Sequence, residues 1–77
     1  MEEVANIFGI NVFMKARKHL RPSIYIEYMG FKAGFRITSG EMFTGIVPHK
    51  ERAIIKEFVG IYRERLLDIW NNKLIIH

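Results

Sequence analysis

Apolar and polar residues alternate along three short stretches in the middle of the chain, at residues 23–28, 31–38 and 41–47. Such alternation is typical of β-strands with one buried and one solvated face. Met29-Gly30 and Ser39-Gly40 separate the stretches, and glycine supplies the positive φ that a two-residue hairpin turn needs. The pattern therefore predicts three antiparallel strands joined by two tight turns.

Two-residue turns would fix the register and assign each side chain to one sheet face. The predicted buried face, with Thr44 as its one polar member, consists of Ile24, Ile26, Tyr28, Phe31, Ala33, Phe35, Ile37, Met42 and Ile46. The predicted outer face consists of Tyr25, Glu27, Lys32, Gly34, Arg36, Phe43 and Gly45. In this register the facing pairs include Glu27 with Lys32, Ile37 with Met42, Arg36 with Phe43, Ala33 with Ile46, and Gly34 with Gly45. The glycine pair leaves a shallow trough, which either Tyr25 covers or another backbone approaches.

The flanking segments add one strand and one helix. Alternation over residues 7–17 predicts a first strand with even-numbered positions inward and Phe13, Lys15 and Arg17 outward. Residues 18–22 form a basic loop, because Pro22 disfavours helix and withholds a donor from a ladder. Pro48 is suited to open a helix over residues 49–72. The helix has an apolar stripe made of Ile55, Phe58, Val59, Tyr62, Leu66, Ile69 and Trp70.

These elements predict an α+β fold in one domain, residues 1–77: a four-stranded antiparallel meander with one long C-terminal helix packed on one face. Gly60 costs the helix about 1 kcal/mol relative to Ala, so we expect a bend or break there. Leu67 lies on the polar side of the helix. Residues 74–76 are too apolar to be left in water, so we expect a short edge strand or a partner contact. The predicted oligomer contact is Leu67, Leu74, Ile75 and Ile76.

Composition places the chain among small globular proteins. The sequence has no cysteine, so a disulfide framework and a thiolate metal site are excluded. The longest uncharged run, residues 4–14, is shorter than the roughly 20 residues that span a bilayer. The start is acidic, whereas a secretory signal would be basic. We therefore expect a cytoplasmic protein without membrane contact, and its small size favours a homo-oligomer.

Positive charge is concentrated in one part of the chain. The net charge is +4, and residues 13–36 contain six cations, Lys15, Arg17, Lys18, Arg21, Lys32 and Arg36, against Glu27 alone. A basic block beside exposed aromatic residues fits a nucleic-acid surface, although small proteins also carry such a bias without that partner. His49, Lys50 and Arg52 crowd the helix start, where either solvent or an acidic group would meet them.

Catalytic and metal-binding patterns are weak. His19, His49 and His77 fall on separate elements, so no histidine pair with ligand spacing is present. Glu57, Glu64 and Asp68 share a helix face that could hold a hard cation, but a solvated charged face explains them better. The sequence has neither a glycine-rich phosphate loop nor a nucleophile elbow. We therefore predict no cofactor and favour a binding protein over an enzyme.

The chain resembles the bacterial family catalogued as domain of unknown function forty-one-sixty, over residues 6–70. The likeness runs through Phe8-Gly9-Ile10, His19 with Pro22, Ile26-Glu27-Tyr28, Gly40-Glu41, Gly45-Ile46-Val47-Pro48, and Arg63-Glu64-Arg65-Leu66-Leu67-Asp68-Ile69-Trp70. Members typically carry Pro-Pro-His-Phe-His at the turn before the second strand. Here that run is Arg21-Pro22-Ser23-Ile24-Tyr25, so both histidines are absent, and this departure counts against any activity that rests on the pair.

The resemblance also implies a partner, because such genes often lie in pairs that look like toxin–antitoxin modules. The first hypothesis is thus a protein-binding module that uses the outer sheet face. The alternative is a metal-independent ribonuclease toxin or RNA-binding module with the same face, and the third is an oligomer of purely structural role. The candidate binding residues are Phe13, Lys15, Arg17, His19, Arg21, Tyr25, Lys32, Arg36, Phe43, His49, Lys50 and Arg52.

Overall fold

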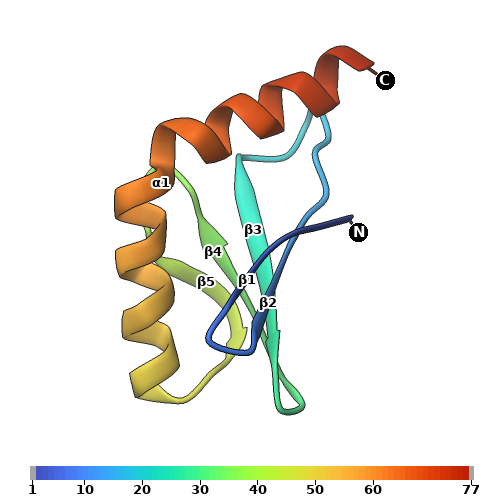
Figure 1. The fold of residues 1–77 in the computed structure, drawn as a ribbon. Coiled ribbons are helices and arrows are strands. Elements are labelled where there is room, and N and C mark those ends of the chain that lie inside the picture. Colours follow the sequence, from blue (N-terminus) through green and yellow to red (C-terminus); the bar gives the residue numbers. More distant parts are fainter. Residues whose placement is uncertain (1, 77) are drawn as a thin grey trace.

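The computed structural model describes residues 2–76, and the side chains of residues 2–74. An antiparallel sheet with strand order β1-β2-β3-β4-β5 packs against one helix (Figure 1). The elements are β1 (Glu2–Ile7), β2 (Ile10–Met14), β3 (Ser23–Tyr28), β4 (Phe31–Arg36), β5 (Met42–Ile46) and α1 (His49–Ile76). The α+β class and the C-terminal helix are as predicted, but the sheet has five strands and not four.

The hairpin of β3 and β4 confirms the first predicted turn. Met29 and Gly30 both have positive φ, and the facing pairs include Tyr28 with Phe31 and Glu27 with Lys32. Positive φ at both central residues is the geometry that matches the twist of the two strands. The predicted buried and outer faces of these two strands follow from this register. At the hairpin end Phe31 is an exception, since it is exposed and not buried.

The predicted first strand, residues 7–17, is wrong because it contains a second hairpin turn. Phe8 and Gly9 have φ values of 50° and 83°, and they reverse the chain so that Ile7 pairs with Ile10. The segment before the turn becomes β1, the fifth strand. Phe8, predicted to face inward, is 85% exposed at the tip of this turn. The even positions of β2 do point inward as predicted, and Val12 is fully buried.

The predicted Ser39-Gly40 turn is also wrong, because residues 37–40 form a longer loop. The Arg36 and Gly40 amides donate to the Glu41 and Arg36 carbonyl oxygens at 2.9 and 2.8 Å, respectively. Four loop residues bring Met42 opposite Phe35. A bulge at Phe43 follows, and the pairing of β5 with β4 resumes one residue later, at Thr44. The observed pairs are Phe35 with Met42, Gly34 with Thr44, Ala33 with Gly45, and Lys32 with Ile46.

The shifted register changes which side chains of β5 reach the core. Met42 still packs against the core, as predicted. Thr44 and Ile46 now pair with outward-facing residues, and Ile46, predicted to be buried, is 72% exposed. Gly45 lies opposite Ala33 and not opposite Gly34. The extra residue of the bulge is Phe43, which lies on the outer face.

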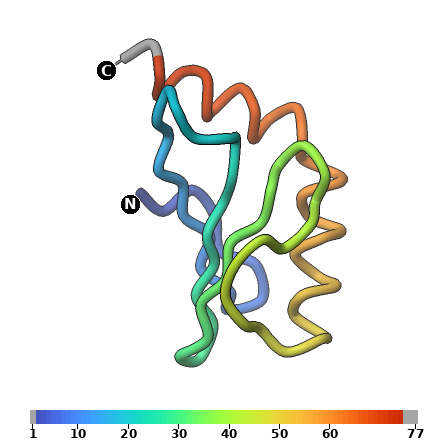
Figure 2. Tube along the Cα trace, turned by 180° about the vertical axis from the view of Figure 1, so that it is seen from behind, coloured from blue at the N-terminus to red at the C-terminus, as the bar shows by residue number. Residues whose placement is uncertain are grey.

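The helix changes direction at Tyr62, whose φ and ψ are −106° and 19°. This break lies two residues after Gly60, where a bend was predicted. Figures 1 and 2 show the first half of α1 running along the sheet, while the second half crosses above the end of β2. The bend lets one amphipathic helix cover two parts of the sheet. Lys73 in the last turns forms an ion pair with Glu2 on β1.

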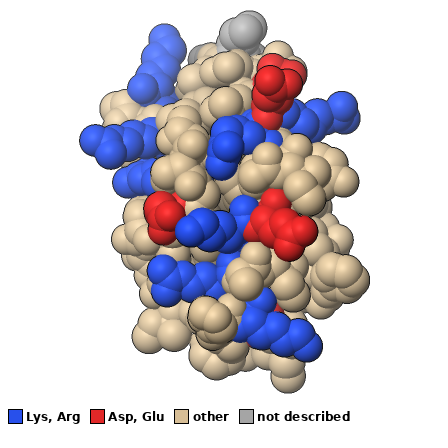
Figure 3. Space-filling view, turned by 90° about the vertical axis from the view of Figure 1, so that its left-hand side faces the viewer, with Lys and Arg blue, Asp and Glu red and all other residues tan. Residues whose placement is uncertain are grey.

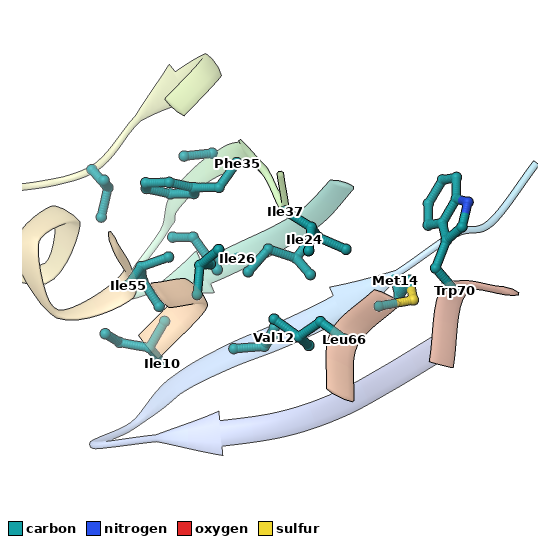
Figure 4. Packing of buried hydrophobic residues seen from close by; sticks show 13 residues of the cluster. Ile10, Val12, Met14, Ile24, Ile26, Phe35, Ile37, Ile55, Leu66 and Trp70 are labelled. Atoms are coloured by element: carbon teal, nitrogen blue, oxygen red, sulfur yellow. The ribbon is translucent and has the colours of Figure 1, made fainter. Parts of the chain in front are cut away.

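The core lies between the sheet and α1. Figure 4 shows side chains from β2, β3 and β4 pointing into the space that Ile55, Leu66 and Trp70 of α1 also enter. The fully or nearly fully buried members are Ile10, Val12, Met14, Ile24, Ile26, Ala33, Phe35, Ile37, Val47, Ile55, Val59, Leu66 and Trp70. Each large aliphatic or aromatic side chain buried in this way stabilises the fold by about 1.5–3 kcal/mol relative to exposure.

The helix begins where the sequence predicts, but it ends later than predicted. It begins at His49, as predicted, and the Pro48 carbonyl oxygen accepts from the Arg52 amide at 2.9 Å. It does not end near Asn72 but continues to Ile76, so residues 74–76 are helical and not an edge strand. Within residues 2–76, no helix is long and apolar enough to cross a membrane.

Candidate functional site

The centre of the outer sheet face is a cluster of Tyr25, Arg36 and Phe43, which we call the aromatic cluster. The Tyr25 and Phe43 rings meet edge to face, with centroids 5.9 Å apart. The Arg36 guanidinium carbon lies 3.8 Å from the Phe43 ring centroid, a cation–π distance. Phe43 faces outward because it follows the inward-facing Met42, and the bulge leaves Thr44 on the same face, so that both side chains lie over Gly34.

Gly34 lies beneath the Phe43 ring. A Cβ at Gly34 would be 2.8 Å from a Phe43 ring carbon and 2.9 Å from the Thr44 methyl carbon. The predicted glycine trough is therefore filled at Gly34 by Phe43, and not by Tyr25. Beside it, Tyr25, Glu27, Lys32, Thr44 and Gly45 are among the residues that line an open hollow of 260 Å³. The outer face thus offers a partner an aromatic ridge next to a depression.

Ser23 holds Arg36 in place. Arg36 Nη1 donates to Ser23 Oγ at 2.9 Å, and Ser23 Oγ donates to the Arg21 carbonyl oxygen at 2.8 Å. Ser23 is buried and faces Arg36 across the β3–β4 ladder. Sequence reasoning missed this positioning role. Ser23 and Tyr25 are alternate positions of one predicted strand, so both should face outward. This alternation could have revealed the role of Ser23.

Other predicted binding residues of the sheet share this face. Phe13 pairs with Tyr25 and is half-buried, so a row of side chains crosses β2 and β3. Lys32 is exposed and lies 3.6 Å from Glu27, the pair that the predicted register placed together. Because both side chains are well exposed, this pair contributes little to stability. Lys32 therefore remains accessible to a carboxylate or phosphate of a partner.

The basic residues of the loop at 15–22 gather at one end of the sheet. Lys15, Arg17, Lys18 and His19 line a hollow of 640 Å³ together with Glu2, Lys73 and other residues. Arg21 is exposed in the same loop. We call this end of the molecule the basic end. It adjoins the outer face through Arg36, which Ser23 connects to Arg21.

The predicted cations of the helix start do not join this surface. His49, Lys50 and Arg52 are exposed at the opposite end of the molecule, where α1 begins. Figure 3 shows Lys and Arg interspersed with Asp and Glu on the side of the molecule where the first half of α1 lies. The candidate binding residues thus divide into the outer face with its basic end, and a separate helix start.

The predicted oligomer contact has an intrachain explanation for part of its residues. Leu67 and Leu74 are half-buried and pack against the core, because the bend at Tyr62 brings this part of α1 over the sheet. The side chains of Ile75 and Ile76 lie outside those that the structure describes. His77 lies outside the described residues as well. An oligomer through this segment stays a prediction.

The chemistry available at the outer face is recognition by charge and by aromatic contact. Among residues 2–76, no group of three or more His, Cys, Asp or Glu side chains is arranged to hold a metal ion. The aromatic cluster and the basic end instead combine guanidinium and ammonium groups with ring surfaces. Such groups bind carboxylates, phosphates and apolar side chains.

Comparison with known proteins identifies one family. No curated protein and no solved structure matches the chain. A family model described as "Domain of unknown function (DUF4160)" matches residues 9–71, which cover β2 to α1 and include the aromatic cluster. The match spans most of the 77 residues and agrees with the resemblance in the sequence motifs. The chain therefore belongs to the DUF4160 family.

Proposed function

We propose that this protein is a binding module whose outer sheet face receives a protein partner with acidic side chains. The observation that carries the proposal is the aromatic cluster, which combines a Tyr, a Phe and an Arg on the sheet face opposite α1. Tyr and Arg are enriched among the residues that dominate the energy of protein interfaces. Ser23 fixes the Arg36 rotamer, so less side-chain entropy would be lost on binding.

The charge around the cluster defines the partner. Lys32 stands on one side of the aromatic cluster and the basic end on the other, and Glu27 is already paired with Lys32. A partner with carboxylates at its rim would meet cations on both sides of the cluster. Complementary charge mainly raises the association rate and selects the partner. The family resemblance suggests the product of a neighbouring gene, in a pair of toxin–antitoxin type.

The geometry of the rings favours a protein over a nucleic acid as the ligand of this face. Sequence-tolerant binding of single strands uses aromatic rings on which bases stack face to face. Here Arg36 covers one face of Phe43, and the edge-to-face contact with Tyr25 further restricts the space around both rings. An apolar side chain can pack against such a ridge from several directions, whereas a flat base needs a free ring face.

The proposal is tested by removing both rings of the cluster. We expect Tyr25→Ser with Phe43→Ser to weaken binding to the neighbouring gene product by about 30-fold or more, the effect of losing one hot spot of about 2 kcal/mol. Binding would be measured by co-purification and then by titration calorimetry. Tyr62→Ser is the matched control, because it removes an exposed aromatic ring from α1. Unchanged binding by a folded double variant would refute the proposal.

A second candidate function is RNA binding through the basic end. The supporting observation is the 640 Å³ hollow lined by Lys15, Arg17 and Lys18, since phosphate contacts need cations and not free rings. With about four phosphate contacts on a single strand, log K should fall with log salt with a slope of roughly −3. The absence of salt-dependent binding to RNA oligonucleotides would rule it out. Exchange of the three cations for Gln should abolish RNA binding and leave the rings intact.

A further inference from the structure

Lys73 adds a fourth cation to the hollow at the basic end. The charged side chains that line this hollow are Glu2, Lys15, Arg17, Lys18 and Lys73. Four cations therefore share it with one carboxylate, an excess of +3. Among residues 2–74, Lys15, Arg17 and Lys18 form no ion pair, whereas Lys73 pairs with Glu2. The hollow thus contains one paired cation and, within this part of the chain, three cations without a carboxylate.

These charges come from three separate parts of the chain. Glu2 begins β1, and Lys73 lies in the last turns of α1. The other three cations belong to the segment that follows β2, and Figures 1 and 2 both show this segment beside the last turns of α1. Glu2 reaches the same place because it pairs with Met14, the last residue of β2. Tertiary structure therefore gathers the cations around the pair of Lys73 and Glu2.

The two members of this ion pair differ in exposure. The side chain of Lys73 is 16% exposed, whereas that of Glu2 is 71% exposed. A mostly buried ammonium group needs an anion beside it, because a buried charge without a partner is costly. An exposed carboxylate has no such need, since water solvates it when it leaves. The geometry therefore allows Glu2 to be exchanged for another anion, provided that the new anion keeps Lys73 paired.

We propose that the hollow at the basic end binds phosphate groups of RNA, and that the Glu2 carboxylate occupies the place of one phosphate until RNA displaces it. The inference rests on the second candidate function, because that function uses the same hollow. It adds Lys73 as a phosphate ligand and Glu2 as an internal competitor. The hydrogen bond from Lys73 Nζ to Glu2 Oε1 supports this, because an oxyanion is already held there.

A ligand that displaces Glu2 must offer the hollow more than one carboxylate does. A single carboxylate of a partner has the same charge as Glu2, which β1 holds near Lys73 at a high effective concentration. A strand of phosphates instead brings several anions at once, and these reach the cations that Glu2 leaves without a partner. Phosphate oxygens also accept charge-assisted hydrogen bonds from Lys and Arg. The excess of cations thus favours a polyanion over a single acidic group.

The pair of Lys73 and Glu2 also ties β1 to the end of α1. If this were its whole role, neutralising Glu2 would lower the stability of the fold and leave RNA affinity unchanged. If Glu2 competes with phosphate, neutralising it raises RNA affinity. The direction of the change in RNA affinity therefore separates the two roles.

The test compares two variants that remove the same charge from the same strand. Glu2→Gln releases Lys73, and Glu3→Gln is the matched control, because Glu3 is exposed and pairs with Phe13 on the outer sheet face. Fluorescence anisotropy with a labelled oligouridylate at roughly 50 mM salt gives the affinities. We expect Glu2→Gln to bind about two- to fivefold more tightly than the parent, the factor by which a partly exposed ion pair competes. Glu3→Gln should change the affinity by less than about 1.5-fold, since salt screens distant charges.

A third variant tests Lys73 as a phosphate ligand. Lys73→Met should make the slope of log K against log salt shallower by about 0.7, the contribution of one phosphate contact with a single strand. A purely structural role of Lys73 would not change this slope. Circular dichroism checks that each variant is folded, and if Lys73→Met is not, Glu2→Gln decides.

Inorganic phosphate provides a test on the parent protein. Added to a ¹⁵N-labelled sample at constant ionic strength, with chloride as the reference anion, it should shift the amide signals of residues 2, 15–18 and 73. Shifts at these positions, together with tighter RNA binding by Glu2→Gln, would support the proposal. Tighter RNA binding by that variant without phosphate shifts would also support it, and would assign the hollow to a polynucleotide backbone and not to free phosphate.

The remaining outcomes contradict the inference in distinguishable ways. Equal RNA binding by the parent, Glu2→Gln and Glu3→Gln would overturn it and leave the second candidate function standing, as would an unchanged salt slope in a folded Lys73→Met variant. Absence of both RNA binding and phosphate shifts would end the inference and that function together. Phosphate shifts without RNA binding would replace RNA by a small phosphate compound. Tighter binding of an oligoglutamate peptide than of RNA by Glu2→Gln would assign the hollow to an acidic protein segment and also overturn the proposal.

Discussion

Replacement of Gly45 by Ala should be among the most damaging single-methyl changes in this protein. Gly45 has φ 84°, and a Cβ there would lie 2.1 Å from the Lys32 carbonyl oxygen and 2.6 Å from Ala33 Cα. These are backbone atoms of the paired strand, so no side-chain rotation can relieve the overlap. Normal contact requires at least about 3.4 Å, so β5 would have to move away from β4 by more than an ångström.

Gly30→Ala provides a matched control for the effect of backbone conformation. Gly30 has the same φ of 84°, but nothing lies within 4 Å of its added Cβ. Left-handed backbone costs a non-glycine residue about 1–2 kcal/mol, and this cost is common to both variants. The lower entropy of Ala in the unfolded chain is also common to both. The difference between the variants therefore isolates the overlap with β4.

We expect Gly45→Ala to lose at least about 2 kcal/mol more than Gly30→Ala, within the range of 1–3 kcal/mol or more for overpacking. A domain of this length has a total stability of roughly 4–12 kcal/mol, so the loss would be large. Urea unfolding followed by circular dichroism gives both free energies by linear extrapolation. If the two variants differed by less than about 0.5 kcal/mol, the pairing of Gly45 with Ala33 would be refuted, since smaller differences are within experimental scatter.

Three further substitutions test other parts of the structure by the same unfolding assay. Gly60→Ala should stabilise the protein by about 0.5–1 kcal/mol, because Gly60 is helical and has open space where the Cβ would go; a loss would show that the bend depends on glycine. Arg63→Met should cost about 1–3 kcal/mol, because Arg63 Nε donates to the Ile37 carbonyl oxygen at 2.9 Å in a half-buried setting; an unchanged midpoint would contradict that contact. Gly34→Ala should lower the free energy of unfolding by only about 1–3 kcal/mol, because the Phe43 ring above it can rotate away. The free energy of partner binding should fall by more than the free energy of unfolding.

The β3–β4 hairpin could be predicted from the sequence because its signals agree. Met29-Gly30 separates two alternating stretches, and only one parity buries the apolar residues on both sides. The helix start was predictable for the same kind of reason, since Pro48 removes a donor where none is needed. In both places the local backbone preference and the burial pattern favour one structure.

The first hairpin could not be recognised from alternation alone. Ile7 and Phe8 are both apolar, so the pattern can be read through them with either parity. If the even-numbered positions face inward, the segment is a single strand with Phe8 buried. In the structure, Ile7 is partly buried and Phe8 is exposed. The Phe-Gly pair has the same form as Met29-Gly30. That comparison, and not periodicity, would have suggested the turn.

The β4–β5 register failed for a different reason. Glycine at positive φ can close a four-residue loop as well as a two-residue turn, so Gly40 alone does not set the loop length. The length is set by tertiary contacts, because Arg63 of α1 holds the carbonyl of Ile37, and the Ile37 amide donates to Pro22 at 3.0 Å. Sequence patterns report local preferences, and these contacts join residues that are 26 and 15 positions apart in the chain.

The proposed binding surface lies where the chain departs from local preference. The aromatic cluster lies beside a bulge and beside two glycines within strands, and the turns at 8–9 and 29–30 have Phe and Met at left-handed positions. Each departure costs stability in a small domain that has little to spare. Elsewhere, in β2, β3 and the first half of α1, burial pattern and backbone preference agree. Conflicts between burial pattern and backbone preference concentrate at functional sites in natural proteins.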